Sequence, residues 1–235
     1  MTDMMITVKM PLWQKILGWI MIVMHLFLLY PLILLVCDLL DLNFNPYVLQ
    51  IIDFIACFVL TFAIFFPFLK ANFKTFGRSA KKSFLALLIG LAVLFALNFA
   101  VNTLIDTLAP ADYGNANEAA LDTMAQYYYW PMVICTAFIV PITEEVLYRG
   151  VVHQILYQRS RILAYVISTF VFAFIHVFGY IGVEGVSAYS LFLSFHTYLP
   201  AGIALALSYE LSDSIWVPIM IHSINNFIAM VPINL

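Results

Sequence analysis

Long apolar segments recur along the chain and are separated by short polar stretches. A helix needs about 20 residues to cross a bilayer, and each segment approaches or exceeds that length. The segments run over Trp13–Val36, Tyr47–Leu69, Ser83–Ile105, Gln126–Tyr157, Ile162–Phe178, Ser187–Leu207 and Ile215–Ile233. The pattern predicts an all-α, polytopic membrane bundle of about seven transmembrane helices.

The fourth segment is too long for one straight span, and it contains Pro131 and Pro141. A proline inside a helix removes a backbone donor and kinks or ends the helix. We therefore expect a broken fourth element, with Glu144 and Glu145 just after the second break. If its two parts are separate helices, the bundle has eight spans.

The composition also indicates a membrane protein. Of the 235 residues, 64% are hydrophobic and 10% are charged, whereas a soluble domain carries about 25% charged residues. The lipid bilayer is the expected environment, and no basic patch interleaved with aromatic residues indicates nucleic-acid binding. The cysteines Cys37, Cys57 and Cys135 lack CxxC spacing, which argues against a disulfide framework and a thiolate zinc site.

The loops between the seven segments alternate in charge, with basic residues in one set of loops and acidic residues in the other. All ten basic residues fall on one side: Lys9, Lys15, Lys70, Lys74, Arg78, Lys81, Lys82, Arg149, Arg159 and Arg161. The loops of the other side carry only acids: Asp38, Asp41, Asp106, Asp112, Glu118, Asp122 and Glu184. Because Lys and Arg mark cytoplasmic loops, we expect a multi-pass cell-membrane protein with its N-terminus in the cytoplasm and its C-terminus outside.

Polar groups lie inside three apolar segments, where ionisable residues mark functional sites by default. They are Glu144, Glu145 and Arg149 in the fourth segment, His176 in the fifth, and His222 and Asn226 in the last. The helix rise places Glu144 and His176 roughly 22 Å from the basic side, and His222 and Asn226 roughly 12 and 18 Å from it. We expect Glu144, His176, His222 and Asn226 to line one cavity open to the cytoplasm.

Helical spacing separates the two carboxylates of the first motif. Glu145 and Arg149 are four residues apart, so they share a helix face and can pair. Glu144 points about 140° away from Arg149 and stays free. A free carboxylate in a partly dry cavity suits a general base that acts on water.

The other polar groups complete a hydrolytic site without a Ser or Cys nucleophile. His176 would orient the water or protonate the leaving amine. His222 and Asn226, again four residues apart, would donate hydrogen bonds to an oxyanion. Structural alternatives exist: the acids could begin a helix capped by Thr143, and the later groups could simply join helices.

Other polar residues have no motif around them. His25, His153 and His196 are interpreted as structural, and the intramembrane Asp53 is unexplained. A retinal protein is excluded because the last three segments contain no lysine for a Schiff base. A transporter is disfavoured because the chain has no visible inverted repeat.

Three ordered motifs carry a resemblance to a known family. Glu-Glu-x-x-x-Arg ends at Arg149, Phe-x-x-x-His covers Phe172–His176, and His-x-x-x-Asn covers His222–Asn226. This set resembles the CAAX prenyl protease type II and bacteriocin-processing (CPBP, Abi) family. The likeness covers roughly Gln126 to Pro232, so we divide the chain into N-terminal transmembrane helices over 1–124 and a catalytic helical core over 125–235.

The resemblance implies an intramembrane glutamate-dependent endopeptidase acting on a membrane-associated peptide or protein. It implies catalytic Glu144 and Glu145, with Glu144 as the base assisted by His176. His222 and Asn226 would stabilise the oxyanion, and Arg149 would give structural support. No cofactor and no metal are expected.

Two alternatives remain beside this interpretation. A Glu/His/His set can also bind zinc, so a zinc-dependent membrane metalloprotease stays open. A non-catalytic membrane interaction or immunity protein with the same fold is the other. Small bacterial members of the family serve in bacteriocin self-immunity or peptide maturation, and the resemblance does not decide between these roles.

Overall fold

The computed structural model describes residues 6–110 and 113–231, and all regular secondary structure in this part of the chain is helical. The α-helices are α1 (Leu12–Val23), α2 (Leu29–Leu39), α3 (Pro46–Arg78), α4 (Ala80–Leu108), α5 (Ala116–Ile134), α6 (Val140–Glu145), α7 (Gln154–Tyr157), α8 (Arg161–Phe178), α9 (Ala188–Ser212) and α10 (Trp216–Met230). Three π-helical segments join some of them: η1 (Met24–Leu28), η2 (Cys135–Ile139) and η3 (Val146–His153). The predicted all-α, polytopic bundle is confirmed.

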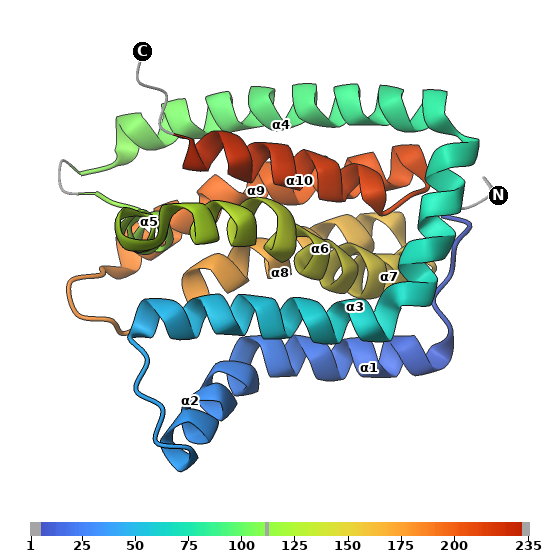
Figure 1. Cartoon of the computed structure of the whole chain (residues 1–235). Helices are drawn as coiled ribbons and strands as arrows, with labels where there is room; N and C mark the ends of the chain where they lie inside the picture. The colour runs from blue at the N-terminus through green and yellow to red at the C-terminus, as the bar shows by residue number, and fades with distance from the viewer. Residues whose placement is uncertain (1–5, 111–112, 232–235) are drawn as a thin grey trace.

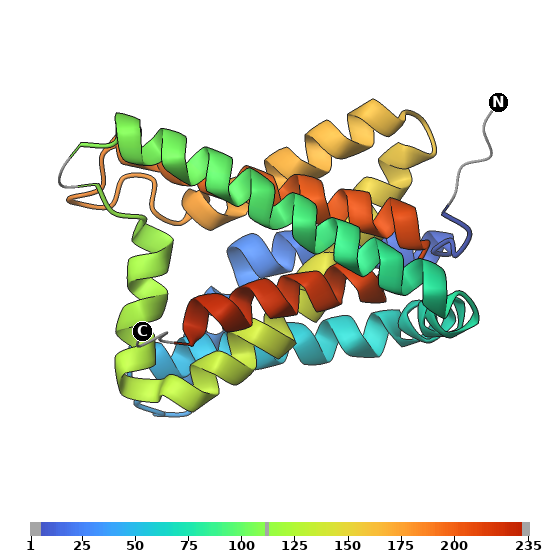
Figure 2. The same ribbon diagram turned by 90° about the horizontal axis from the view of Figure 1, so that it is seen from above.

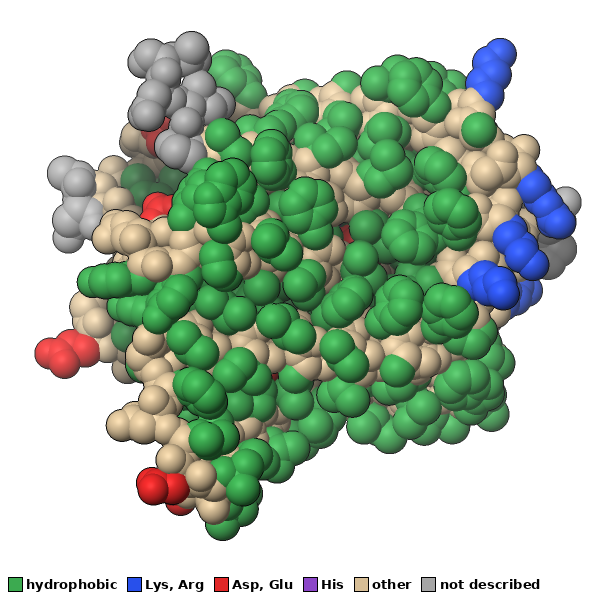
Figure 3. Space-filling model, in the orientation of Figure 1, with side chains coloured by type: hydrophobic (Ala, Val, Ile, Leu, Met, Phe, Trp, Pro, Cys, Tyr) green, Lys and Arg blue, Asp and Glu red, His purple; other side chains and the backbone are tan. Residues whose placement is uncertain are grey.

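Most of the helices run side by side along one axis (Figures 1 and 2). Helix α9 packs between α4 and α8, and it approaches α8 closely because Gly202 has no side chain. A Cβ at Gly202 would lie 3.1 Å from the Cα of Thr169. Exposed Leu, Ile, Val and Phe side chains cover the outside of the bundle (Figure 3), as expected for a lipid-facing surface.

Six helical runs are long and apolar enough to cross a membrane: Leu12–Leu39, Pro46–Arg78, Ala80–Leu108, Ala116–Tyr157, Arg161–Phe178 and Ala188–Ser212. The predicted seventh segment forms α10, whose 15 residues span about 22 Å. It is shorter than the other six and mostly buried on its first turns. The seventh predicted segment is thus present as α10, and its expected end, Ile233, lies outside the described residues.

The fourth run is broken, as predicted, but the break does not fall at either proline. Its break lies at Tyr128, where φ is −135° and ψ is 52°. Pro131 follows in the first turn after this break, where a helix needs no N–H donor. Pro141 follows the π-helical η2, whose wider turn relieves the loss of a backbone hydrogen bond. The first half of α5 consequently lies across one end of the bundle (Figure 2).

Charged side chains gather at opposite ends of the molecule (Figure 3). The basic end contains the start of α1, the turn from α3 to α4, and the start of α8. The other end carries acidic side chains and is called the acidic end below. Arg149 departs from the predicted pattern, because its side chain is fully buried inside the bundle. Asp112 lies outside the described residues.

Candidate active site

Glu144 and Glu145 are the last residues of α6, and the helix continues into η3. Both side chains are buried, with exposed fractions of 6% and 0%. Thr143 lies inside α6 and its hydroxyl has no hydrogen-bond partner in the described structure, so the alternative of a helix start capped by Thr143 is wrong. The π-helical turns that follow are a feature often found at functional sites.

Arg149 holds Glu145, as the spacing predicts. Its Nε lies 3.2 Å from Glu145 Oε2, with both side chains fully buried. The guanidinium also donates from Nη2 to the carbonyl of Gly202 at 3.3 Å, and it lies 4.3 Å from the ring centre of Phe172. The pair therefore joins the fourth run to α8 and α9 at the centre of the bundle.

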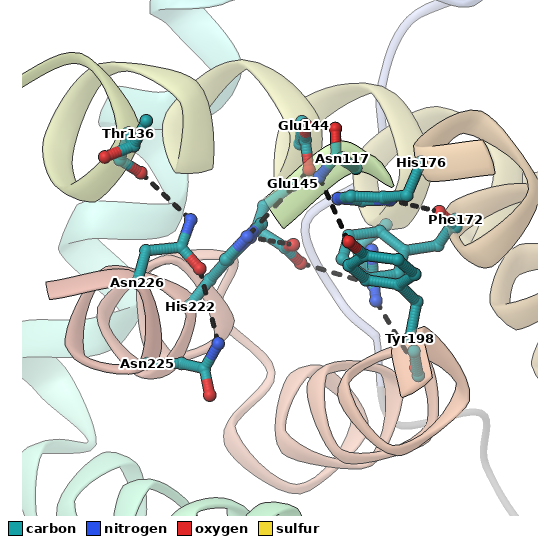
Figure 4. A network of polar contacts seen from close by, with 12 residues as sticks. Asn117, Thr136, Glu144, Glu145, Phe172, His176, Tyr198, His222, Asn225 and Asn226 are labelled. Atoms are coloured by element: carbon teal, nitrogen blue, oxygen red, sulfur yellow. Dashed lines mark hydrogen bonds and ion pairs between the residues drawn. The ribbon is translucent and has the colours of Figure 1, made fainter. Parts of the chain in front are cut away.

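His222 of α10 lies between the two carboxylates (Figure 4). Its Nδ1 is 3.0 Å from Glu145 Oε1, and its Nε2 is 3.9 Å from Glu144 Oε2. A carboxylate only accepts hydrogen bonds when ionised, so Nδ1 carries the proton facing Glu145. When His222 is protonated, the charges of Glu144, Glu145, Arg149 and His222 sum to zero. Opposite charges at this distance offset the free energy lost when charged groups leave water.

His176 approaches Glu144 from α8 (Figure 4). Its Nδ1 donates to the carbonyl of Phe172 at 2.7 Å, because a carbonyl can only accept. Its ring stacks on Tyr198 with centroids 4.2 Å apart, and the Tyr198 hydroxyl accepts from Asn117 Nδ2 at 3.0 Å. In the neutral imidazole, Nε2 is left with a lone pair that can accept a proton or a hydrogen bond from water.

Asn226 lies one helical turn after His222 and faces a different neighbour. Its Nδ2 donates to the carbonyl of Thr136 at 2.9 Å, and its Oδ1 accepts from Asn225 at 3.3 Å. An amide nitrogen has two N–H groups, so one donor of Asn226 is not used by these contacts. The shared oxyanion role of His222 and Asn226 stays a prediction; one nitrogen of His222 faces Glu145 and one N–H of Asn226 faces Thr136.

Two neighbouring cavities divide the predicted site. The larger, of about 480 Å³, is lined by Glu144 and His176. The smaller, of about 160 Å³, is lined by His176 and Asn226. His222 lines neither cavity and is buried behind Glu144. The sequence predicts one cavity lined by all four side chains; neither of these two cavities is, although His176 lines both.

The larger cavity lies towards the acidic end, contrary to the prediction that it opens on the basic side. Its walls come from the start of α3, the start of α5, and the end of α8 with Gly179. These element ends lie together opposite the basic end (Figure 1). The helix rise gives only the distance of each residue from the basic side. The side on which the cavity opens depends instead on which helices move apart at their ends. Helix α2 turns away from the bundle after η1, and α5 lies across the acidic end (Figures 1 and 2).

The lining of the larger cavity also includes an acid and a histidine that the sequence analysis left out of the site: Asp53 of α3 and His25 of η1. His25 was interpreted as structural, yet it lines the cavity, and its Nδ1 lies 3.4 Å from Cys57 Sγ. For Asp53, the sequence does contain an indication of a functional role, because an acid lies within an apolar segment. The buried His153 fits its structural interpretation, since its Nδ1 lies 3.1 Å from Ser168 Oγ.

In residues 6–110 and 113–231, no three His, Cys, Asp or Glu side chains are grouped so that they could hold a metal ion. Glu144 and His176 share a cavity wall, but His222 is directed to Glu145 through Nδ1. A three-ligand zinc site of the catalytic type needs its ligands around one point. The observed arrangement does not fit that requirement.

Comparison with known proteins identifies one family. Residues 126–228 match the family model described as Rce1-like, type II CAAX prenyl endopeptidase Rce1-like. The matched segment contains all three motifs, so the resemblance inferred from them is confirmed. No curated protein and no solved structure matches the chain. The roles of the individual residues and the division at residue 125 stay predictions.

Proposed function

We propose that this chain, whose residues 126–228 belong to the type II CAAX prenyl endopeptidase family, is a glutamate-dependent intramembrane endopeptidase. Its substrate would be a membrane-associated peptide or protein that enters the larger cavity. Glu144 would be the general base, His176 would orient the water, and Glu145 and Arg149 would hold the site together. In a cell, such an enzyme would serve peptide maturation or bacteriocin self-immunity, as small members of the family do.

One observation carries this proposal: the two adjacent carboxylates have different surroundings. Glu145 is engaged by Arg149 and His222 at 3.2 and 3.0 Å. Glu144 lines the cavity, and its Oε2 has no hydrogen-bond partner in the described structure. A purely structural acid pair would have both members engaged, whereas a base must be free to take a proton from water.

The reaction follows from these positions. Glu144 takes a proton from a water molecule, and the hydroxide adds to the carbonyl carbon of the scissile peptide. The oxyanion would accept hydrogen bonds from the unused N–H of Asn226 and from His222 Nε2, which the substrate must uncover because His222 lines neither cavity here. The carboxylic acid of Glu144 then gives its proton to the departing amine as the C–N bond breaks. Water is the only co-reactant.

The test is a comparison of membrane peptides from cells that contain the wild-type protein or its Glu144→Ala variant. We expect peptides with new termini in the wild-type membranes only, and mass spectrometry of both fractions measures them. Identical peptide sets, together with no cleavage of any synthetic membrane peptide by the purified protein, would instead support a non-catalytic binding role.

Cleavage by the purified protein is expected to continue in EDTA or phenanthroline. The proposed reaction uses protein groups to activate water and to stabilise the oxyanion, so no Lewis acid takes part in it. The initial rate with and without chelator is the measurement, and a metal-free buffer is the control. Activity that disappears in chelator and returns with added zinc would favour the metalloprotease alternative.

We also propose that the basic end faces the cytoplasm, because Lys and Arg are retained on that side during insertion. The larger cavity would then receive its substrate from the non-cytoplasmic half of the membrane. The gathering of Lys and Arg at one end of the molecule supports this orientation (Figure 3). The cavity walls lie at the other end, which supports substrate entry from that side.

Single cysteines at the two ends test the orientation. Gly179 and Gly77 are both exposed, at the cavity end and at the basic end. In a background with Cys37→Ser, Gly179→Cys should react with a membrane-impermeant maleimide on intact cells, and Gly77→Cys should react only after lysis. The reverse labelling pattern would place the cavity on the cytoplasmic side.

A further inference from the structure

We propose that Asp53 forms an anionic subsite of the larger cavity, which accepts a Lys or Arg side chain of the substrate close to the scissile bond. This inference rests on the proposed endopeptidase function and deepens it by naming a substrate feature. Asp53 lies on α3, outside the segment that matches the family model.

The cavity wall is unbalanced in charge. Its lining residues include two carboxylates, Asp53 and Glu144, and no Lys or Arg. Glu144 has His222 at 3.9 Å as a neighbour of opposite charge when that ring is protonated. Asp53 has no ion-pair partner among the described residues. The unbalanced negative charge of the cavity therefore lies at Asp53.

Asp53 lacks the hydrogen-bond partners that Glu210, another buried acid, has. Its residue is 5% exposed, and its Oδ1 accepts no hydrogen bond in the described structure. Its Oδ2 has only a long contact of 3.4 Å from Gln50 Nε2. By comparison, Glu210 accepts from Tyr157, Tyr165 and Arg161 at 2.8, 2.5 and 3.0 Å.

A buried carboxylate without a partner lowers the stability of the protein. A ligand that carries a positive charge would offset this loss. Removing one ion from water carries an effective penalty of several kcal/mol, which a well-placed opposite charge offsets. Acids inside membrane segments consequently mark ligand or substrate pathways by default. Gln50, which contacts Asp53, is neutral, and neither Gln50 nor the other lining residues supply a Lys or Arg for Asp53.

The dimensions suit an extended cationic side chain. Asp53 lies seven residues after Pro46, which places it about 10 Å from the start of α3 at the acidic end. Lys and Arg have apolar stems that lie along hydrocarbon surfaces while the charged group reaches a polar partner. The volume of about 480 Å³ is in the range of pockets that enclose a small ligand. A peptide at Glu144 can thus extend one side chain to Asp53.

The test uses synthetic apolar membrane peptides with a fluorophore and a quencher, identical except for one residue. Lys, norleucine or Glu is placed in turn at each position within three residues of the centre. Wild-type protein in liposomes is expected to prefer Lys over norleucine by roughly tenfold or more in kcat/KM at one position. In Asp53→Asn, the ratio of the two rates should fall to about one, whatever the absolute rates are.

Asp38→Asn is the matched control, because Asp38 is an exposed acid at the end of α2 and lines neither of the two cavities described above. It should keep the Lys preference of the wild type. A Lys preference that survives in Asp53→Asn, or norleucine peptides cleaved as well as Lys peptides by the wild type at every position, would overturn the subsite.

A binding measurement separates this inference from the proposed function. In the Glu144→Gln background, the Lys peptide should bind more tightly than the norleucine peptide by fluorescence anisotropy. The difference should vanish in the double variant with Asp53→Asn. Binding that depends on Asp53 without any cleavage by the wild type would contradict the endopeptidase and keep the subsite; equal binding of both peptides to both proteins would refute the subsite alone.

Discussion

Replacing Glu144 with Gln is expected to lower kcat for peptide cleavage by about 10²–10⁴-fold, the usual contribution of a positioned general base. Gln has nearly the same shape as Glu but cannot take a proton from water. The fold should tolerate the change, because Glu144 Oε2 has no hydrogen-bond partner in the described structure and its nearest charged neighbour, His222, is 3.9 Å away.

The measurement is the cleavage rate of one peptide by purified wild-type and variant proteins at saturating substrate. Glu184→Gln is the matched control, since it removes the same carboxylate from an exposed loop residue, and it should keep the wild-type rate. Thermal unfolding in the same detergent checks that the Glu144 variant is folded. A folded Glu144→Gln protein with normal turnover would show that another group activates the water.

Replacing Arg149 with Ala is expected to destabilise the protein by about 3–5 kcal/mol, the usual result of breaking a buried ion pair from one side. Arg149 is fully buried, pairs with Glu145 at 3.2 Å, and donates to Gly202 O at 3.3 Å. Its removal leaves a buried carboxylate whose remaining partner is His222. It also leaves a cavity beside Phe172, which adds to the loss.

Thermal unfolding of each variant in one detergent measures this effect. For a domain of this size, 3–5 kcal/mol corresponds to a fall in Tm of roughly 6–20 °C. Arg161→Ala is the matched control: the Arg161 side chain is 65% exposed although it pairs with Glu210, so its loss should cost about 0–1 kcal/mol. Glu144→Ala should also cost less. Equal melting temperatures for the Arg149 and Glu144 variants would contradict the structural role of Arg149.

The sequence predicted the identity of the polar groups better than their arrangement. The spacing of Glu145 and Arg149 predicted their pair, because neighbours on one helix face are set by the helical repeat alone. The contact of His222 with Glu145 was not predicted, since it depends on how α10 rotates against α6. The same rotation brings the amide nitrogen of Asn226 to the carbonyl of Thr136.

The position of the helix break illustrates a second limit. Pro131 and Pro141 were expected to break the fourth run, because a proline in a helix interior disrupts it. The break at Tyr128 made Pro131 a first-turn residue, and the π-helical η2 accommodated Pro141. Proline composition is visible in the sequence, whereas the turn on which each proline falls depends on where the helix begins.

By itself, the sequence determined that this is a helical membrane protein whose few intramembrane ionisable groups include Glu144 and Asp53. Hydrophobicity is a local property, and burying a charge in hydrocarbon is unfavourable wherever the chain runs. Only the tertiary structure decided that these two carboxylates share a cavity at the acidic end. That outcome depends on α2 turning away after η1 and on α5 crossing the end of the bundle, and such packing between distant segments leaves no periodic signal in the sequence.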